Sequence, residues 1–277
     1  MSTESRRLIR KVRGGSQAHL FETTDGHSYV VKFSNNPQGR RILINEWIAS
    51  AVLRHLQIAT PKTAFVHVSE AFLAENRDAF LQLRSGRRPI EAGWHFGSRF
   101  PGYPASTEVY DFLPDALFPT VENVTDFRGV LAFDKWMGNT DARQAIFFRA
   151  TPKDHFQSHN SHRVKGGMIA QMIDNGNVFQ GADWRLSSTP IQGLYFRPQM
   201  YQCIRGIQDF EPWLTRIVGF PEEVLLQAAK ALPSSWLADD EMALEMLLTK
   251  LLQCRSYVPD LIRRCRSDPT NPFPHWT

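Results

Sequence analysis

Short apolar segments alternate with turn-forming residues at the start of the chain. Residues 7–13, 18–24 and 28–34 are rich in β-branched and aromatic side chains, and they are separated by Gly14-Gly15 and Asp25-Gly26. Short runs bounded by glycine-containing turns predict strands, and Asp-Gly favours a hairpin. We therefore expect an antiparallel meander over this part of the chain.

The pattern then changes to helical spacing. Residues 39–57 place apolar side chains near one face of a helix, and the helix is expected to end before Thr60-Pro61. The apolar positions are Ile42, Trp47, Ile48, Val52, Leu53 and Leu56. Residues 63–69 and 95–100 predict further strands, and the segment 101–106, with two prolines and a glycine, marks the best boundary between two lobes.

Helical periodicity prevails after about residue 107. Residues 126–137, 221–232 and 239–265 predict helices, whereas 143–150 and 166–174 predict a strand pair joined by an exposed polar loop. The pattern as a whole predicts an α+β fold. A strand-rich N-lobe is expected over residues 1–106 and a mainly helical C-lobe over residues 107–277.

The composition is compatible with an enzyme and argues against a nucleic-acid-binding tail, a zinc site and a membrane span. With 277 residues, 42% of them hydrophobic, the chain can bury a substantial core, and its formal charge of +4 is a mild excess that suits phosphate-bearing ligands. The charge is far short of a nucleic-acid-binding tail. The cysteines, Cys203, Cys254 and Cys265, have no zinc-site spacing. No apolar run approaches the roughly 18 residues of a membrane span, and we expect a cytoplasmic protein.

The first candidate for chemistry is the glycine pair in residues 12–20. Gly14 and Gly15 lie at the tip of a predicted hairpin, where backbone N–H groups could cover phosphate oxygens. An ordinary hairpin turn explains the pair equally well.

The second candidate is a lysine and a glutamate. Lys32 lies in the apolar strand segment 28–34, and Glu46 follows on the predicted helix. A lysine buried in a strand needs a partner, and Glu46 is a plausible one. The alternative is a strand-edge lysine that extends to water, with Glu46 on a solvated helix face.

Two aspartates supply the remaining candidates. Asp141 lies in the polar cluster 138–144 between a predicted helix and strand, where it could orient or accept the proton of an attacking hydroxyl. Asp174 ends a predicted strand just before Asn175-Gly176, a suitable place to hold Mg²⁺ against nucleotide phosphates. Each aspartate could also be an ordinary turn residue.

The order of these pieces along the chain resembles the HipA-like kinases, a bacterial branch of the protein-kinase-like fold, and is closest to short members that consist of little more than the kinase core. The resemblance covers roughly residues 10–215. It is carried by "GGSQAHL", "YVVKF", "NEWIAS", "HFGSRF", "VYDFLPDAL", "FDKWMGNTDARQAIFF" and "MIDNG". It implies a two-lobed, ATP-dependent phosphotransferase that uses Mg²⁺, with serine/threonine protein kinase activity as the usual family assignment.

The resemblance also implies a role for each site residue. Gly14, Gly15, Ser16 and Gln17 would form the phosphate loop, Lys32 would contact phosphates, and Glu46 would pair with Lys32. Asp141 would be the catalytic aspartate and Asp174 the metal ligand. The segment "GSRFPG", with Arg99 and Phe100, would lie near the hinge beside the adenine.

Two departures from the family pattern are informative. Most related kinases have an asparagine five residues after the catalytic aspartate, but Ile146 stands there in this chain. We expect Gln144 to supply the second metal contact instead. We expect the chain to lack the extra N-terminal subdomain of the longer toxin-type members, so a toxin role cannot simply be transferred.

Other functions stay open at this point. The phosphate acceptor could be a small molecule or a lipid head group, the chain could be a nucleotide-binding pseudokinase with a regulatory role, and an antitoxin-like partner is a further option. Arg40, Arg41 and Arg143 could recognise anionic groups.

Two further residue groups have simpler interpretations. His155, His159 and His162 lie in a polar segment that is better interpreted as a solvated loop than as a metal site. Trp47, Trp136, Trp213 and Trp236 are interpreted as core residues rather than a stacking surface for nucleic acid.

Overall fold

A computed structural model describes residues 1–149, 167–186, 189 and 192–277. The strands are β1 (Ser2–Lys11), β2 (His19–Thr23), β3 (Ser28–Lys32), β4 (Thr63–Val68), β5 (Phe80–Leu83), β6 (Gly86–Pro89), β7 (Gly93–Arg99), β8 (Val109–Tyr110), β9 (Gln144–Arg149) and β10 (Met168–Ile173). The α-helices are α1 (Arg41–His55), α2 (Glu70–Glu75), α3 (Asp126–Met137), α4 (Trp213–Val218), α5 (Glu222–Lys230), α6 (Ser234–Leu237), α7 (Glu241–Cys254) and α8 (Val258–Arg266). Short 3₁₀ segments occur at Asp115–Thr120, Val178–Asp183, Pro198–Met200, Ile207–Phe210 and Arg255–Tyr257.

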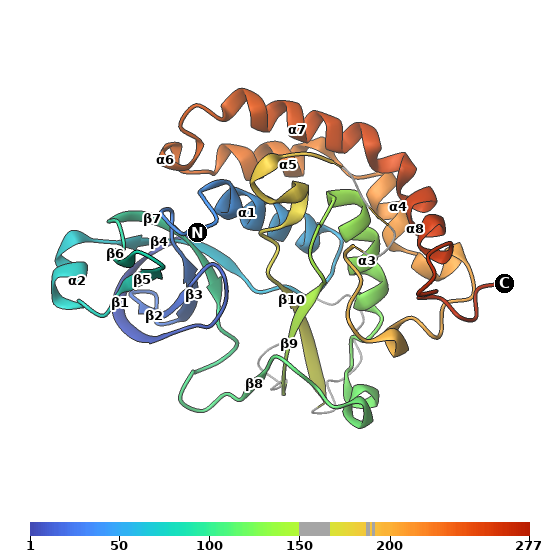
Figure 1. Ribbon diagram of the computed structural model, residues 1–277, viewed down its shortest axis with the longest axis horizontal. Coiled ribbons are helices and arrows are strands. Elements are labelled where there is room, and N and C mark those ends of the chain that lie inside the picture. Colours follow the sequence, from blue (N-terminus) through green and yellow to red (C-terminus); the bar gives the residue numbers. More distant parts are fainter. Residues whose placement is uncertain (150–166, 187–188, 190–191) are drawn as a thin grey trace.

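The N-terminal part is a closed β-barrel with the strand order β1-β2-β3-β7-β4 (Figure 1). β1, β2 and β3 pair antiparallel in sequence order, which confirms the predicted meander. The barrel closes where Ser2 to Glu4 pair in parallel with β4. β1 thus begins earlier than predicted, because its first residues are polar and gave no apolar signal. Phe21, Val31 and Val66 belong to the apolar cluster inside the barrel.

A small addition to the barrel was not predicted. It consists of α2 and the β5–β6 hairpin, both inserted between β4 and β7. The Ser69 hydroxyl caps α2 by accepting a hydrogen bond from the Phe72 amide at 3.1 Å. Phe72 and Leu81 belong to the barrel's apolar cluster, so the insertion extends that core.

Helix α1 lies between the barrel and the C-terminal helices (Figure 1). The six predicted apolar positions are buried, but the sequence did not predict that every residue from 42 to 50, polar ones included, is buried. The physical reason is that α1 is covered on several sides. Phe65 of the barrel stacks on Trp47, and the Trp47 indole donates to the carbonyl of Ala228 on α5 at 3.0 Å.

The rest of the chain combines a small sheet with helices. The sheet has the strand order β10-β9-β8, and the antiparallel β9–β10 pair confirms the predicted strand pair. α3 packs against α4, α7 and α8, and its Trp136 indole donates to the Leu251 carbonyl at 2.9 Å. Trp47, Trp136, Trp213 and Trp236 are all buried, which confirms their interpretation as core residues. The molecule is therefore a mixed helix-and-strand fold.

One segment joins the barrel to the small sheet. It runs from the end of β7 at Arg99 to the start of β8 at Val109, and the predicted lobe boundary at residues 106–107 falls within it. The predicted polar loop and its three histidines, His155, His159 and His162, lie outside the described residues. In the part of the chain that the structure describes, no helix has the length and apolar character needed to cross a membrane.

Candidate active site

Three charged residues from distant parts of the chain meet at the centre of the molecule. Lys32 is the last residue of β3, Glu46 lies in the middle of α1, and Asp174 follows the end of β10. The Lys32 ammonium contacts Oε1 of Glu46 and lies 2.7 Å from Oδ1 of Asp174. The side chains of Lys32 and Glu46 are 11% and 4% exposed, whereas that of Asp174 is 36% exposed. Asp174 is the most exposed of the three, so it can reach a ligand while it keeps its contact with the lysine.

Neighbouring charges keep Lys32 and Asp174 ionised. Burial disfavours the charged ammonium, but Glu46 and Asp174 outweigh that effect and raise the pKa of Lys32 above its ordinary value. Burial likewise disfavours the charged form of Asp174. The positive charges of Lys32 and, to a smaller extent, Arg143 outweigh the effect of burial, so the pKa of Asp174 is lowered. The lysine is thus a fixed positive charge, and Asp174 is a fixed carboxylate.

Asp174 and Gln144 lie side by side. Gln144 is the first residue of β9 and pairs in register with Ile173, the residue before Asp174. The Gln144 side chain is among the groups that lower the pKa of Asp174, after Lys32 and Arg143, and Gln144 is exposed. The structure therefore brings the two predicted metal ligands together.

These two side chains fit a hard divalent cation. Carboxylate and carboxamide oxygens are the donors that Mg²⁺ and related ions prefer. Among the described residues, no group of three or more histidines, cysteines, aspartates and glutamates could hold a metal ion. A cation at this position would be held by the Asp174 carboxylate and the Gln144 carboxamide oxygen.

The turn after β10 packs tightly against α1. Asp174 itself has a left-handed backbone with φ of 58°. A Cβ atom on Gly176 would lie 2.6 Å from Cγ2 of Ile42, so only glycine allows this approach. The Asn45 amide donates to the carbonyl of Gly176 at 2.8 Å. These contacts fix Asp174 relative to the helix that carries Glu46.

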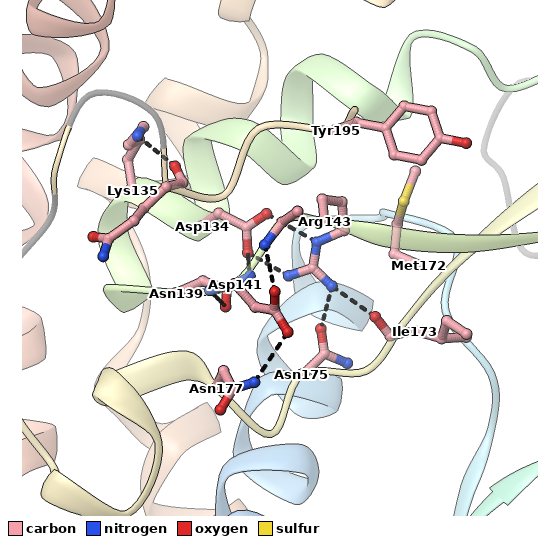
Figure 2. A network of polar contacts seen from close by, with 12 residues as sticks. Asp134, Lys135, Asn139, Asp141, Arg143, Met172, Ile173, Asn175, Asn177 and Tyr195 are labelled. Carbon is pink, nitrogen blue, oxygen red and sulfur yellow. Dashed lines mark hydrogen bonds and ion pairs between the residues drawn. The ribbon is translucent and has the colours of Figure 1, made fainter. Parts of the chain in front are cut away.

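Asp141 lies in the loop between α3 and β9. Its Oδ1 accepts from the Ala142 amide at 2.8 Å, and its Oδ2 accepts from Nδ2 of Asn177 at 3.2 Å (Figure 2). The Asp141 amide donates to Oδ1 of Asn139 at 3.1 Å. The carboxylate is half-buried and is held by donors from two loops.

Arg143 connects the loop of Asp141 to the turn of Asp174 (Figure 2). Its side chain is fully buried, contacts both carboxylate oxygens of Asp134, and donates to the carbonyl of Ile173 at 2.9 Å and to Oδ1 of Asn175 at 2.8 Å. Burial opposes its charge, and Asp134 offsets this and raises the pKa of Arg143. The sequence interpretation of Arg143 as a residue that recognises a ligand's anionic group is therefore wrong, because its side chain is 0% exposed and its charge is paired with Asp134.

The other two arginines also have protein partners. Arg41 pairs with both carboxylate oxygens of Asp240, at 2.9 and 2.5 Å, and Arg40 donates to the Ser235 carbonyl at 3.3 Å. Both contacts tie the start of α1 to the region of α6 and α7.

The glycine pair forms the turn between β1 and β2. Gly14 has φ of 138°, a conformation that side-chain-bearing residues rarely adopt, and Gly14 and Gly15 are exposed. The Gln17 side chain pairs with the backbone of Gln82, donating to its carbonyl and accepting from its amide, each at 2.6 Å. Gln17 thus anchors the turn to β5. Gly14 and Gly15 are the exposed part of the turn, and Ser16 beside them is half-buried.

Arg99 and Phe100 lie where the barrel ends. The Arg99 amide donates to the Lys62 carbonyl and the Phe100 amide to the Ser28 carbonyl, both at 2.8 Å. Their backbone amides are therefore used in hydrogen bonds within the barrel. The segment that follows Phe100 leads to β8.

Sequence reasoning missed the asparagines that connect the site. Asn175 and Asn177 follow Asp174 at intervals of one and three residues, and both link the Asp174 turn to the loop of Asp141. The available signal was a strand end followed by two asparagines around a glycine, which was interpreted only as a turn.

The chain is similar in sequence to a protein family and in fold to a solved kinase structure. The family model described as HipA-like kinase matches residues 6–149, just over half of the chain. No curated protein matches the chain significantly in sequence. The crystal structure of the Golgi casein kinase is similar, with a TM-score of 0.52 and 11% sequence identity, over 96% of this chain and 73% of that one. A crystal structure of the Golgi casein kinase with Mn/ADP bound has a TM-score of 0.46 and 10% identity, over 95% of this chain and 72% of that one.

Proposed function

Because the chain belongs to the HipA-like kinase family, we propose that it is an ATP- and Mg²⁺-dependent phosphotransferase that phosphorylates a serine or threonine hydroxyl of a protein. The observation that carries the proposal is the contact of one lysine with two carboxylates. Lys32 touches Glu46 on α1 and Asp174 after β10, the arrangement that protein-kinase-like enzymes use to hold nucleotide phosphates and metal. The bilobal interpretation belongs to the same proposal, with the nucleotide between the barrel and the helical part.

Residues of the barrel would bind the phosphates of the nucleotide. The backbone of the exposed Gly14 and Gly15 and of the half-buried Ser16 would cover the phosphate oxygens, and Lys32 would neutralise them while Glu46 keeps the ammonium in place. Arg99 and Phe100 would lie beside the adenine at the start of the joining segment. Gln17 would serve the loop by anchoring it to Gln82.

The metal side would be built by Asp174 and Gln144. When bound there, Mg²⁺ would supply positive charge that offsets the negative charge developing during phosphoryl transfer. Asp174 keeps one contact with Lys32 and is more than a third exposed, so it can hold a cation and the lysine at once. Gln144 would offer its carboxamide oxygen from the first position of β9.

The acceptor side would be built by Asp141. Its carboxylate would orient the incoming hydroxyl and take up its proton as the oxygen attacks the γ-phosphorus. The bond from the γ-phosphorus to the bridging oxygen breaks, ADP leaves, and a phosphoester remains on the acceptor. A small-molecule or lipid head-group hydroxyl would react in the same way, so the acceptor panel below distinguishes these classes.

A second candidate function is a nucleotide-binding pseudokinase. It is favoured by one observation, the isoleucine at position 146. Ile146 lies inside β9 and pairs with Gln171 of β10, so no amide reaches the metal side from that position. A chain that binds nucleotide without transferring phosphate would act through its conformation, for example toward an antitoxin-like partner.

The decisive experiment compares Asp141→Asn and Asp174→Asn. Nucleotide binding is followed by thermal shift with Mg-ATP, and transfer is followed with γ-labelled ATP against itself, a cell lysate and a metabolite panel. Asp174→Asn is expected to lose both the Mg²⁺-dependent shift and turnover, since it holds the cation. Asp141→Asn is expected to keep the shift and to lose roughly 10²–10⁴-fold in turnover, as for general acid–base groups.

The wild-type protein decides between the candidate functions. Binding of Mg-ATP without transfer to any acceptor would leave the pseudokinase. No response to nucleotide at all would contradict both functions. Label found only in metabolites would move the proposal to a small-molecule kinase.

A further inference from the structure

Asn177 reaches back from the Asp174 turn to the loop that carries Asp141 (Figure 2). Its backbone carbonyl accepts from the Thr140 amide at 3.1 Å and from the Thr140 hydroxyl at 3.3 Å. Its side-chain Nδ2 donates to Oδ2 of Asp141 at 3.2 Å. A carboxylate only accepts hydrogen bonds, so the NH₂ group of Asn177 must be the one that faces it.

This contact completes the restraint of Asp141. The Ala142 amide holds Oδ1 from within the same loop, and Asn177 holds Oδ2 from the other loop. Each carboxylate oxygen accepts about two hydrogen bonds, so both keep capacity for a hydroxyl. Among the described residues, the bond from the Ala142 amide is the one restraint on this carboxylate that would remain without Asn177, and it holds a single oxygen.

Asn177 supplies an asparagine near Asp141, where this chain lacks the one that related kinases have. The resemblance to related kinases calls for an asparagine five residues after Asp141, but Ile146 occupies that place within β9. Gln144 turns instead toward Asp174. On these contacts we propose that Asn177 is the positioning residue for Asp141, so that its amide, from the metal-binding turn, fixes the carboxylate for the incoming hydroxyl. This inference rests on the proposed phosphotransferase function.

A purely structural role for the side chain is separable from this one. Asn177 has φ of −92° and ψ of 8°, a conformation open to any residue, and it is half-buried. Its contacts with Thr140 use the backbone carbonyl, which every substitution keeps. Asn177→Ala therefore removes the bond to Asp141 and leaves the connection between the loops.

The experiment is a double-mutant cycle with Asn177→Ala and Asp141→Ala, read by single-turnover transfer from γ-labelled ATP. Asn177→Ala is expected to lower the transfer rate about tenfold or more while the KM for ATP changes less than about twofold, because a misplaced reacting group costs rate and not binding. In the Asp141→Ala background the same change is expected to have no further effect. Asn177→Ser, whose hydroxyl is a donor, should recover part of the rate.

Each outcome bears on the proposal. Losses that multiply in the double variant, or an Asn177→Ala protein with an unchanged rate, would overturn the positioning role. Loss of the Mg-ATP thermal shift in Asn177→Ala, as expected for Asp174→Asn, would make Asn177 a metal ligand and would also overturn it. A wild type that transfers no phosphate overturns the proposed function itself, and that result is visible before any variant is compared.

Discussion

The ammonium of Lys32 lies 2.7 Å from the carboxylate of Asp174, although 142 positions separate the two residues. The same ammonium contacts Glu46 on α1. That helix is held on its far side as well, where Trp47 donates to the Ala228 carbonyl and Arg41 pairs with Asp240. The C-terminal helices therefore fix the helix that carries Glu46, and the fold itself keeps the lysine and its two carboxylates together.

The first prediction separates charge balance from phosphate contact at Lys32. Lys32→Met leaves the buried Glu46 carboxylate without its partner and should lower the free energy of unfolding by about 3 kcal/mol, as when one member of a buried pair is removed. Adding Glu46→Gln removes the unpaired charge and should restore much of that loss. Turnover should stay roughly 10²-fold or more below wild type in both proteins. Denaturant unfolding and γ-phosphate transfer measure the two effects.

The outcome of this comparison is specific. If the double variant regained turnover together with stability, Lys32 would be a structural residue. If the single variant kept wild-type turnover, the phosphate contact would be wrong.

The second prediction concerns Gln144 and Mg²⁺. Gln144→Ala removes the carboxamide next to Asp174 and should raise the Mg²⁺ concentration needed for half-maximal activity, because one oxygen donor is lost. Stability should change little, since Gln144 is exposed. The matched control is Gln253→Ala, an exposed glutamine on α7. An Mg²⁺ dependence equal to that of the control would return Gln144 to the status of a surface residue.

Local pattern was sufficient for much of the fold, since strand residues before glycine turns predicted the meander. For Lys32 and Glu46 it offered a buried pair as one of two interpretations, and the structure contains that pair. Lys32 and Glu46 are only 14 positions apart, and the chemistry of each is visible in its own segment.

Contacts between distant segments could not be predicted in this way. The full burial of α1 depends on elements such as α5, which begins at Glu222, and no periodicity within residues 39–57 reports that second covering layer. Arg143 shows the same limit. An arginine beside a polar loop is usually exposed, and its burial depends on Asp134 on α3 and on Asn175 beyond β10.

The third prediction tests Arg143 as the link between the two loops. Arg143→Met should destabilise the protein by roughly 3–5 kcal/mol, because Asp134 would be left buried and charged. Adding Asp134→Asn should recover part of this, since Asn139 can still donate to the new amide oxygen. Both proteins lose the bonds to Ile173 and Asn175, so both should show reduced turnover and a weaker thermal shift with Mg-ATP. A double variant with wild-type turnover would show that this link does not position Asp174.

The last prediction concerns pH and the buried histidine His95. His95 on β7 is fully buried, its Nδ1 accepts from the Ser34 amide at 3.0 Å, and its Nε2 lies 3.0 Å from the Glu91 carbonyl. This bonding pattern requires a neutral ring with the proton on Nε2. Burial, with a small contribution from His67, lowers the pKa of His95 from 6.5 to about 4.

The sign of the pH effect follows from the direction of that shift. The unfolded chain takes up a proton on His95 as the pH falls through 6.5, whereas the folded protein does so only near pH 4, so acid favours unfolding across this interval. The contribution of His95 to the free energy of unfolding should therefore fall by about 2 kcal/mol between pH 7.5 and pH 5, and by about 3 kcal/mol by pH 4. His95→Gln cannot titrate, so urea unfolding at several pH values should show the difference in stability between wild type and this variant shrinking toward acid. His275→Gln, at an exposed site, should track wild type at every pH. A difference between wild type and His95→Gln that stayed constant from pH 7.5 to pH 5 would mean that His95 is protonated in the folded protein as readily as in the unfolded chain.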